Sequence, residues 1–396
     1  MAKAGSWLCL LLCCSITNGA PFIWTLKFKH HNHLVLKSKL AAYAAGYPHI
    51  ARFYTLSKKS AEGRELMVVE ISDNVGIHEP GEPEVKYVGN MHGNEISGRE
   101  TLLHLIDYLC TKYGEDDRVT SLVNSTRIHI MPTMNPDGYS RSPVEQCRGN
   151  QGRWNANSVD LNRNFPDRFN RGHSTREPET LALMEWIAEY PFVLSANLHG
   201  GALVASYPYD NSRDASDVYT ASPDDDVFRH LALTYSRNHP TMHIREASGF
   251  VDGITNGADW YSIDGGMQDY TYLQSNCFEI LVEQGFCKYP SYSYIETLWR
   301  DNRESLLVFL EQVHMGVKGF VRAVNGTAIR GARVDVTGRD HPVYTAVDGD
   351  YWRLLLPQVY QITVSADGFL DVRRSNISVR AGVVTELDFV LQRDSK

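Results

Sequence analysis

The chain has 396 residues, of which 43% are hydrophobic, and its formal net charge at pH 7 is −8. This length suits two domains, or one large domain with an appendage, and the apolar fraction is ample for a sizeable core. The negative charge and the lack of basic runs argue against a nucleic-acid partner.

The first 20 residues predict a secretory signal peptide. Lys3 precedes an apolar run from Trp7 to Leu12, and small residues follow near Gly19 and Ala20, which is the order of a removable signal. We therefore expect a secreted mature chain that begins near residue 20 or 21 and meets an oxidising compartment. Direct release and storage in secretory granules both stay open.

Features elsewhere in the chain agree with secretion. Three Asn-x-Ser/Thr sequons, at Asn124, Asn325 and Asn376, are the expected glycosylation sites. No later apolar run approaches membrane-spanning length and the tail from Leu391 is polar, so no membrane anchor is visible. Removal of the signal leaves enough cysteines for one or two disulfides, namely Cys110, Cys147, Cys277 and Cys287.

Helical and strand-like segments alternate from residue 33 to residue 313. Helices are predicted over 33–45, 96–109, 177–186, 227–237 and 294–313, and strands over 64–71, 84–88, 127–131, 192–198 and 277–283. Strands separated by helices predict an α/β fold with a mixed, largely parallel sheet covered by helices on both faces. Residues 134–176 contain no periodic element and residues 249–272 read as an aromatic, glycine-rich loop. Long irregular stretches inside a compact domain are usually functional.

The composition changes at Gly316. Short strand-like runs follow over 333–336, 352–356, 360–365 and 386–391, separated by Asn-Gly and Asp-Gly turns. Such runs predict a small all-β sandwich. This region contains no cluster of titratable residues that looks like a site, so we expect a structural role or the binding of a protein partner.

Two stretches at the ends of predicted strands carry a candidate metal site. His92 and Glu95 lie three residues apart after the strand at 84–88, and His199 follows the strand at 192–198. Open α/β sheets place their sites at the carboxyl ends of strands. Three such protein ligands would leave the fourth position of a tetrahedral zinc open for water, as in catalytic sites. A His-x-x-Glu pattern alone is a common chance match between solvated residues, and its position after a strand is what favours the site.

Five motifs in the same order carry a resemblance to a known family. The motifs are Met91–Glu100, Met134–Gly138, Asp160–Pro166, Ser195–Ala202 and Gly265–Asp269. With them the chain resembles the zinc carboxypeptidases, and within these the regulatory subfamily that includes carboxypeptidases N, M and E. The resemblance covers nearly the whole mature chain, because this subfamily appends a transthyretin-like β-sandwich. It implies a catalytic domain at 21–314 and a sandwich at 315–396, after the signal peptide at 1–20.

The resemblance implies that one zinc ion is held by His92, Glu95 and His199. It also implies that Glu283 is the general base, whereas on sequence alone Glu283 could be a surface acid at a strand end. Glu279, four residues earlier, is expected to support the site rather than to act as the base.

Further residues match the family positions that bind substrate. Arg153 corresponds to the cation that stabilises the oxyanion, with the neighbouring Arg148 as the alternative. The group that binds the terminal carboxylate of the substrate comprises Asn162, Arg163 and Tyr261, and a guanidinium suits that role because it can donate two parallel hydrogen bonds.

Asp210 and Gln268 match residues that line the pocket for the C-terminal side chain. A desolvated carboxylate is costly without a partner, and a substrate Lys or Arg would provide one. On sequence alone, Asp210 could equally be a turn residue.

The chain departs from the family pattern next to the base. Relatives often read Leu-Ser-Cys where this chain has Gln284-Gly285-Phe286, and a cysteine that usually precedes Gly253 is absent. The resemblance therefore implies one disulfide fewer, which leaves a bridge between Cys147 and Cys287 and free, buried thiols at Cys110 and Cys277.

These features predict a secreted zinc carboxypeptidase that removes C-terminal Arg or Lys from peptides and proteins. One alternative is a secreted homologue that binds zinc or peptides with little or no turnover, and the altered segment at 284–286 is its only support. Another is a zinc amidase that acts on acylated amino acids, which would not explain Asp210.

Overall fold

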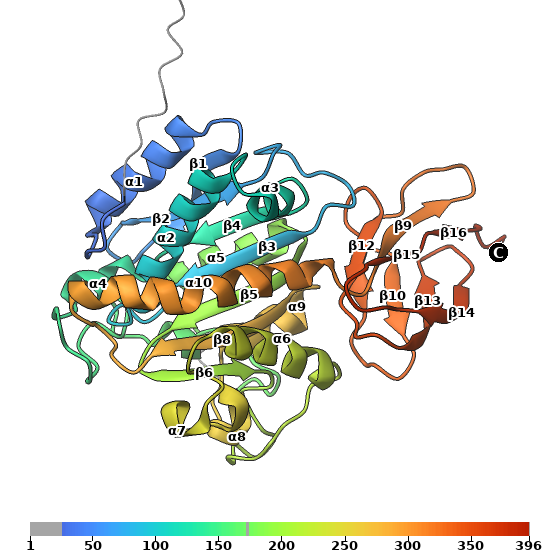
Figure 1. Ribbon diagram of the computed structural model, residues 1–396. Coiled ribbons are helices and arrows are strands. Elements are labelled where there is room, and N and C mark those ends of the chain that lie inside the picture. Colours follow the sequence, from blue (N-terminus) through green and yellow to red (C-terminus); the bar gives the residue numbers. More distant parts are fainter. Residues whose placement is uncertain (1–25, 172–173, 396) are drawn as a thin grey trace, which may run out of the picture.

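The computed structural model describes residues 26–171 and 174–395, so the predicted signal peptide lies outside the described residues. The chain forms a large α/β unit, with a smaller all-β unit beside it at the carboxyl-terminal end (Figure 1). Among the helices of the described residues, none is long and apolar enough to cross a membrane.

One mixed sheet is the centre of the large unit, with the strand order β1-β2-β4-β3-β5-β8-β6-β7. β3 pairs in parallel with β4 and with β5, β5 pairs in parallel with β8, and β6 pairs in parallel with β7. The β1–β2, β2–β4 and β6–β8 pairs are antiparallel. The mixed, largely parallel sheet is therefore confirmed. The strands are β1 (Ala51–Lys59), β2 (Glu65–Ile71), β3 (Glu84–Gly89), β4 (Arg127–Met131), β5 (Phe192–His199), β6 (Ala202–Tyr207), β7 (Ile254–Asn256) and β8 (Phe278–Gly285).

Helices cover both faces of this sheet (Figure 1). Alternate residues of one strand face opposite sides, and in β2 Met67 and Val69 join one apolar cluster while Leu66 and Val68 join another. The first cluster includes residues of α1 (His33–Gly46), α2 (Ser97–Lys112), α3 (Asp117–Val123), α6 (Asp225–Asn238) and α10 (Ile295–Glu311). The second includes residues of α5 (Pro178–Glu189) and α9 (Met267–Gln274). Shorter helices are α4 (Pro136–Arg141), α7 (Arg245–Ser248) and α8 (Gly257–Trp260).

Several elements differ from the sequence-based expectation. β1 and β6 were not predicted, and α9 lies in the stretch that reads as a glycine-rich loop. β1 has a mostly half-buried pattern without strict alternation, so it lacks the periodic signal of a strand. α9 begins directly after Gly265 and Gly266, which mark a turn in the sequence but precede a buried helix.

The small unit is the predicted β-sandwich. Its sheets have the orders β11-β10-β13-β14 and β12-β9-β15, and β16 also pairs with β9. Apolar side chains from both sheets, such as Val321, Val334 and Ile362, form its core. The strands are β9 (Val317–Ala323), β10 (Arg333–Val336), β11 (Val343–Tyr344), β12 (Asp350–Arg353), β13 (Val359–Ser365), β14 (Val372–Ser378), β15 (Thr385–Glu386) and β16 (Phe389–Leu391).

A buried ion-pair network joins the sandwich to the α/β unit. Asp224, at the start of α6, accepts hydrogen bonds from Arg353 Nη2 at 2.7 and 3.0 Å and from Arg339 Nη1 at 2.9 Å. Tyr272 OH donates to the same carboxylate at 2.8 Å. Asp224 and Arg353 are both fully buried, so Arg353 depends on Asp224 for compensation, and Asp224 depends on Arg353 together with Arg339.

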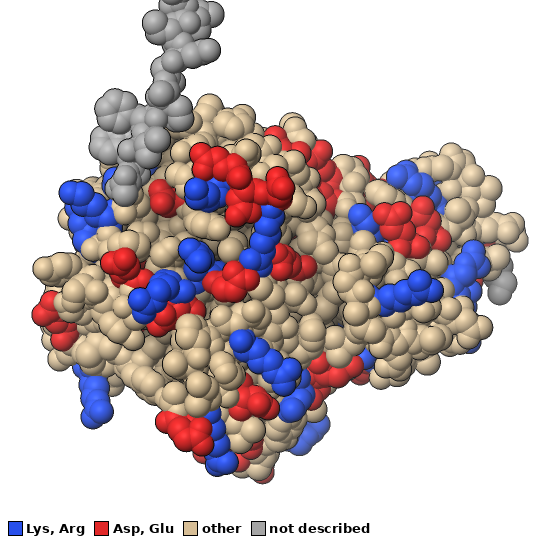
Figure 2. All heavy atoms as spheres, viewed as in Figure 1, with Lys and Arg blue, Asp and Glu red and all other residues tan. Residues whose placement is uncertain are grey.

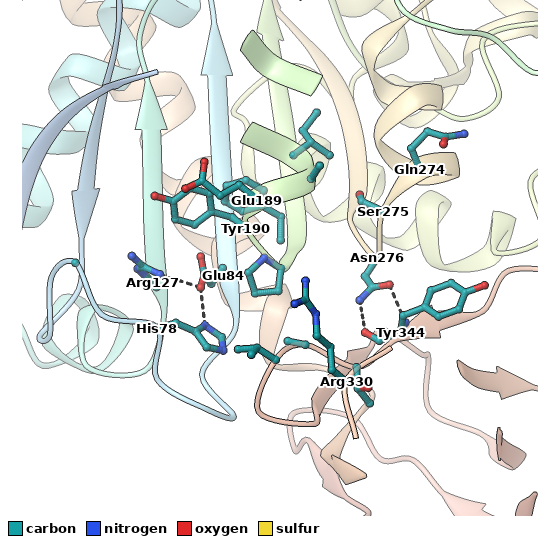
Figure 3. Close-up of a pocket in the computed structure, with 18 residues that line it drawn as sticks. His78, Glu84, Arg127, Glu189, Tyr190, Gln274, Ser275, Asn276, Arg330 and Tyr344 are labelled. Carbon is teal, nitrogen blue, oxygen red and sulfur yellow. Dashed lines mark hydrogen bonds and ion pairs between the residues drawn. The ribbon is translucent and has the colours of Figure 1, made fainter. Parts of the chain in front are cut away.

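A cleft of about 500 Å³ lies between the two units (Figure 3). On its α/β side, Glu84 pairs with His78 at 2.7 Å and with Arg127 at 3.0 Å. Asn276, also of the α/β unit, reaches across to the sandwich, where its side chain donates to Tyr344 O and accepts from Tyr344 N of β11. Glu84 and Arg127 are the first residues of β3 and β4. The cleft therefore lies at the amino ends of these strands, whereas the predicted metal site lies at the carboxyl ends.

The Asp224 network predicts a large cost for removing one partner. Arg353→Ala leaves Asp224 with a partly uncompensated buried charge, and we expect it to lower the free energy of unfolding by about 3–5 kcal/mol. Arg333→Ala is the matched control in the same sandwich, because the Arg333–Asp335 pair is solvent-exposed and should cost less than about 1 kcal/mol. Denaturant unfolding of both variants measures the difference, and equal losses would contradict the prediction.

Candidate active site

The candidate site lies where three parallel strands end. β3, β5 and β8 are neighbours, and His199, the last residue of β5, pairs in register with Glu283 of β8. The turn after β3 carries His92 and Glu95 to the same edge. The strand register therefore places one histidine beside the strand-end acid, while the turn supplies the other two side chains.

The three side chains predicted as metal ligands converge. His92 Nδ1 lies 2.9 Å from Glu95 Oε2 and 3.1 Å from His199 Nδ1, and His199 Nδ1 lies 2.9 Å from the same Glu95 oxygen. All three residues are buried. Two imidazoles and one carboxylate thus present one donor atom each to a common point.

Asn90 holds the turn that carries two of these residues. Its backbone is left-handed, with φ of 56°, a conformation that Asn tolerates better than most residues. Its side-chain nitrogen donates to the carbonyl oxygens of His92, Gly93 and Glu95 at 2.9, 2.9 and 3.1 Å. Asn135 adds a hydrogen bond to Met91 O. Side-chain amides therefore fix the turn from within the protein.

Asp160 orients His92. Its Oδ1 lies 2.9 Å from His92 Nε2, and its Oδ2 accepts from Arg153 at 3.0 Å. Burial acts in the opposite direction, but His92 and Arg153 hold the pKa of the Asp160 carboxyl below its usual range. An ionised Asp160 accepts a hydrogen bond from the Nε2–H group of His92 and so leaves the Nδ1 lone pair free, as in carboxylate–histidine–metal arrangements.

These residues fit a zinc ion. Zinc bonds to nitrogen and carboxylate oxygen are about 2.0–2.2 Å long, so tetrahedral donors lie roughly 3.3–3.6 Å apart. The three observed donor separations, 2.9–3.1 Å, are close to that spacing. A group of three buried donors with a cavity beside it is the arrangement of a catalytic metal centre rather than of a closed structural one.

Two cations contact the second oxygen of Glu95. Arg153 Nη1 lies 3.1 Å and Lys288 Nζ 3.0 Å from Glu95 Oε1. Arg153 lines the cavity beside the metal ligands, whereas Arg148, the alternative for its role, is exposed and is not part of the lining. A disulfide between Cys147 and Cys287 joins the loops that carry the two cations.

That disulfide agrees with the pattern implied by the family resemblance. Cys110 and Cys277 are free and buried, as expected. Burial raises the pKa of both thiols, so neither has the character of a reactive cysteine.

The cavity beside the donors has a volume of about 160 Å³. Besides the metal-site residues, its lining includes Arg163, Tyr261 and Glu283. Tyr261 is 41% exposed at the rim, whereas Glu283 is buried. Burial, followed by the negative charge of Glu95, raises the pKa of the Glu283 carboxyl to about 8.

Asp210 and Gln268 are not among the residues that line this cavity, and they form a buried polar pair. Asp210 is 5% exposed, and Gln268 Nε2 donates to its Oδ1. The other two acceptors, Asp210 Oδ2 and Gln268 Oε1, are buried without a partner among the described residues. Burial raises the pKa of Asp210 to about 7, although the Gln268 hydrogen bond and Arg163 lower it.

Two glycines make room for this acid. A Cβ at Gly257 would lie 2.0 Å from Asp210 Oδ1, and one at Gly266 would lie 2.6 Å from Oδ2. Real Cβ atoms do not approach other atoms so closely, so any other residue at either position would displace the carboxylate. The space around Asp210 therefore depends on these residues as much as on Asp210 itself.

Glu279 lies away from the cavity. It forms a fully buried ion pair with Lys86 and accepts a hydrogen bond from Ser195 Oγ at 2.7 Å. It is not among the residues that line the cavity, which agrees with a supporting role.

Three contact residues of this site were not singled out from the sequence: Asn90, Asp160 and Lys288. Asp160 begins one of the five family motifs, so its position offered a signal. Asn90 and Lys288 act through contacts that no local pattern reveals.

Comparison with known proteins gives the family. Residues 36–305 match the sequence profile of the zinc carboxypeptidases, and residues 316–392 match the carboxypeptidase regulatory-like domain. The chain belongs to the zinc carboxypeptidase family.

Its relatives fall in the regulatory subfamily suggested by the motifs. The chain is 51% identical to carboxypeptidase D of Mus musculus, with 93% of this chain and 27% of that protein covered. It is 45% identical to carboxypeptidase M of Mus musculus, covering 93% and 83%, and 44% identical to the carboxypeptidase N catalytic chain of Mus musculus, covering 95% and 89%. The chain thus spans only about a quarter of the length of carboxypeptidase D.

Solved structures show the same fold for the α/β unit. Carboxypeptidase A from Helicoverpa armigera has a TM-score of 0.58 at 21% identity, covering 72% of this chain and 74% of that chain. Thrombin-activatable fibrinolysis inhibitor has a TM-score of 0.57 at 19% identity, covering 72% and 75%.

The Asp160–His92 contact predicts an effect on metal binding. Asp160→Ala removes the partner of His92 Nε2 and one anchor of Arg153, and we expect zinc affinity to fall about 10–100-fold. Asp160→Asn, which keeps an acceptor oxygen, should lose less. Competition with a zinc chelator measures both values, and an unchanged affinity in Asp160→Ala would show that His92 needs no orienting partner.

Proposed function

We propose that the chain is a secreted, zinc-dependent carboxypeptidase that removes C-terminal Arg or Lys from peptides and proteins. The observation that carries the specificity is the buried carboxylate of Asp210, whose Oδ2 has no partner among the described residues. A buried acid of this kind gains most from a ligand that brings its own positive charge. A substrate ending in Phe or Leu would leave it unpaired.

His92, Glu95 and His199 would hold the zinc ion, which polarises carbonyl groups and lowers the pKa of water in such sites. Glu283 lines the same cavity and is the acid that register places beside His199. We assign it the transfer of a proton from the attacking water to the leaving amine. Arg153 is the cation that faces the negative charge that develops on the carbonyl oxygen.

Arg163 is suited to bind the free carboxylate of the substrate. It lines the cavity and forms no ion pair with an acid of the described residues, and its Nη1 donates only to the neighbouring Asn162 O at 2.9 Å. A guanidinium that has no acid partner within the protein is available to donate hydrogen bonds to the carboxylate of a ligand. Asn162 and Tyr261 line the same cavity and complete the proposed carboxylate site.

Secretion rests on the predicted signal peptide and on the sequons. The side chains of Asn124, Asn325 and Asn376 are all exposed, so each can carry a glycan. We also propose a catalytic domain at 21–314 and a sandwich domain at 315–396, which is the unit available to a protein partner. On the face shown in Figure 2, acidic and basic side chains are interspersed, in keeping with the lack of basic runs in the sequence.

The inactive homologue is the second candidate, and its support came from the segment Gln284–Phe286. Gln284 is buried, accepts from Thr101 Oγ1 at 2.9 Å and donates to Tyr235 OH at 3.0 Å. Phe286 is 57% exposed. The buried Gln284 is hydrogen-bonded through both its amide oxygen and its amide nitrogen, and Phe286 lies at the surface, which favours the active enzyme.

The proposed pocket predicts a clear substrate preference. We expect kcat/KM for peptides that end in Arg or Lys to exceed that for matched peptides ending in Phe. Asp210→Asn should reduce kcat/KM for the basic substrates on the order of a hundredfold, because it removes one member of a buried charge pair. The measurement is a panel of blocked dipeptides assayed with and without a zinc chelator.

Asp214→Asn is the control for this panel, because Asp214 lies on the same loop but is exposed. It should leave the preference unchanged. A native preference for Phe would remove Asp210 from the substrate pocket, and zinc binding without any hydrolysis would favour the inactive homologue.

The raised pKa of Asp210 predicts a pH-dependent preference. With a pKa of about 7, the Asp210 carboxyl becomes neutral when the pH falls below that value, and it then loses its attraction for a basic side chain. The ratio of kcat/KM for substrates ending in Arg to that for substrates ending in Phe should therefore fall as the pH drops from 8 to 6. The polar groups around Asp210 are Gln268 and Asp269 of α9, Glu279 of β8, and Arg163. Protonation steps that affect both substrates equally cancel in this ratio. In the Asp210→Asn variant, which has no titrating carboxyl at this position, the ratio should not depend on pH.

A further inference from the structure

The segment before α1 packs against the first turn of α2. His31 is fully buried. Its backbone N donates to Glu100 Oε1 at 3.0 Å, and its Nδ1 lies 2.7 Å from Glu100 Oε2. Both oxygens of a buried carboxylate on α2 are therefore bound by one residue, 69 positions earlier in the chain.

The backbone carbonyl of His31 is bound as well. It accepts from Arg99 Nε at 3.3 Å, from Arg99 Nη2 at 2.8 Å and from Tyr139 OH at 3.1 Å. The Arg99 guanidinium also lies 3.9 Å from the centre of the Tyr139 ring. One residue of the amino-terminal segment thus contacts two successive residues of the first turn of α2.

This turn leads directly from a proposed metal ligand. Only Ile96 separates Glu95 from α2, and Ile96 packs in a small apolar cluster with Tyr139 and Tyr289. Ile96 N donates to Lys288 O at 3.0 Å, and Lys288 Nζ contacts Glu95. A shift in the first turn of α2 would therefore move both Glu95 and the cation that contacts it.

We propose that His31 is a positioning residue for the metal site, acting through Glu100 on the helix turn that follows Glu95. Among the described residues, the Glu100 carboxylate hydrogen-bonds only to His31, and Arg99 Nε lies 4.0 Å from its Oε1. Loss of the imidazole leaves a buried carboxylate without its side-chain partner, a costly arrangement that the turn would relieve by moving. This inference rests on the proposed zinc site.

The test measures zinc affinity by chelator competition and the unfolding midpoint of the metal-free protein. His31→Ala should raise the zinc Kd about tenfold, the lower end of the range for residues that orient metal ligands. His31→Asn should restore the Kd to within about threefold of wild type, because its amide nitrogen takes the position of Nδ1. Glu100→Gln preserves shape but removes the charge, and it should also raise the Kd.

Asn32→Ala is the matched control. The Asn32 side chain caps α1 by accepting a hydrogen bond from Val35 N at 2.9 Å, and this bond involves only α1. Its loss should lower the unfolding midpoint by roughly 1–2 °C without changing the zinc Kd.

The outcomes separate this inference from the proposed function. A zinc Kd within twofold of wild type in His31→Ala, or an equal rise in Asn32→Ala, would overturn the positioning role. If His31→Ala does not fold, an unchanged Kd in Glu100→Gln overturns it instead. Failure of the wild-type protein to bind one equivalent of zinc would contradict the proposed function itself.

Discussion

The parallel pairing of β3, β5 and β8 is the constraint on which the site depends. Because these strands run in the same direction, their carboxyl ends meet at one edge, and the register sets His199 opposite Glu283. The turn after β3 then needs to place only His92 and Glu95. The two helical layers serve this arrangement by burying both faces of the sheet.

Charge compensation differs between the residues around the proposed metal site and those proposed to bind substrate. Glu95 is balanced by Arg153 and Lys288, Asp160 by Arg153, and Glu279 by Lys86. In contrast, the described residues offer no ion pair to Arg163 and no partner to Asp210 Oδ2. The cation and the anion left uncompensated are of opposite sign to the two charges of a C-terminal Lys or Arg, namely its carboxylate and its side chain.

Much of the fold could be predicted from the sequence because it follows from local patterns. The apolar strands and their flanking helices have clear periodicity, and short motifs at strand ends identified the clustered donors. The missing elements had weak signals: β1 is only half-buried, and α9 follows two glycines. The contacts of Lys288 with Glu95 and of His31 with Glu100 join groups far apart in sequence and depend on tertiary packing that no periodicity records. The bonds of Asn90 are local, but they need a left-handed turn that no periodicity records either.

The amide of Asn90 has a consequence for how the protein acquires its metal. By bonding to three carbonyl groups of one turn, it makes the ordering of that turn part of folding itself. We therefore expect metal uptake to fill a cavity that folding has already formed, in contrast to small zinc domains whose apo state is unfolded. We expect loss of the ion to leave a folded apoprotein that can be reloaded.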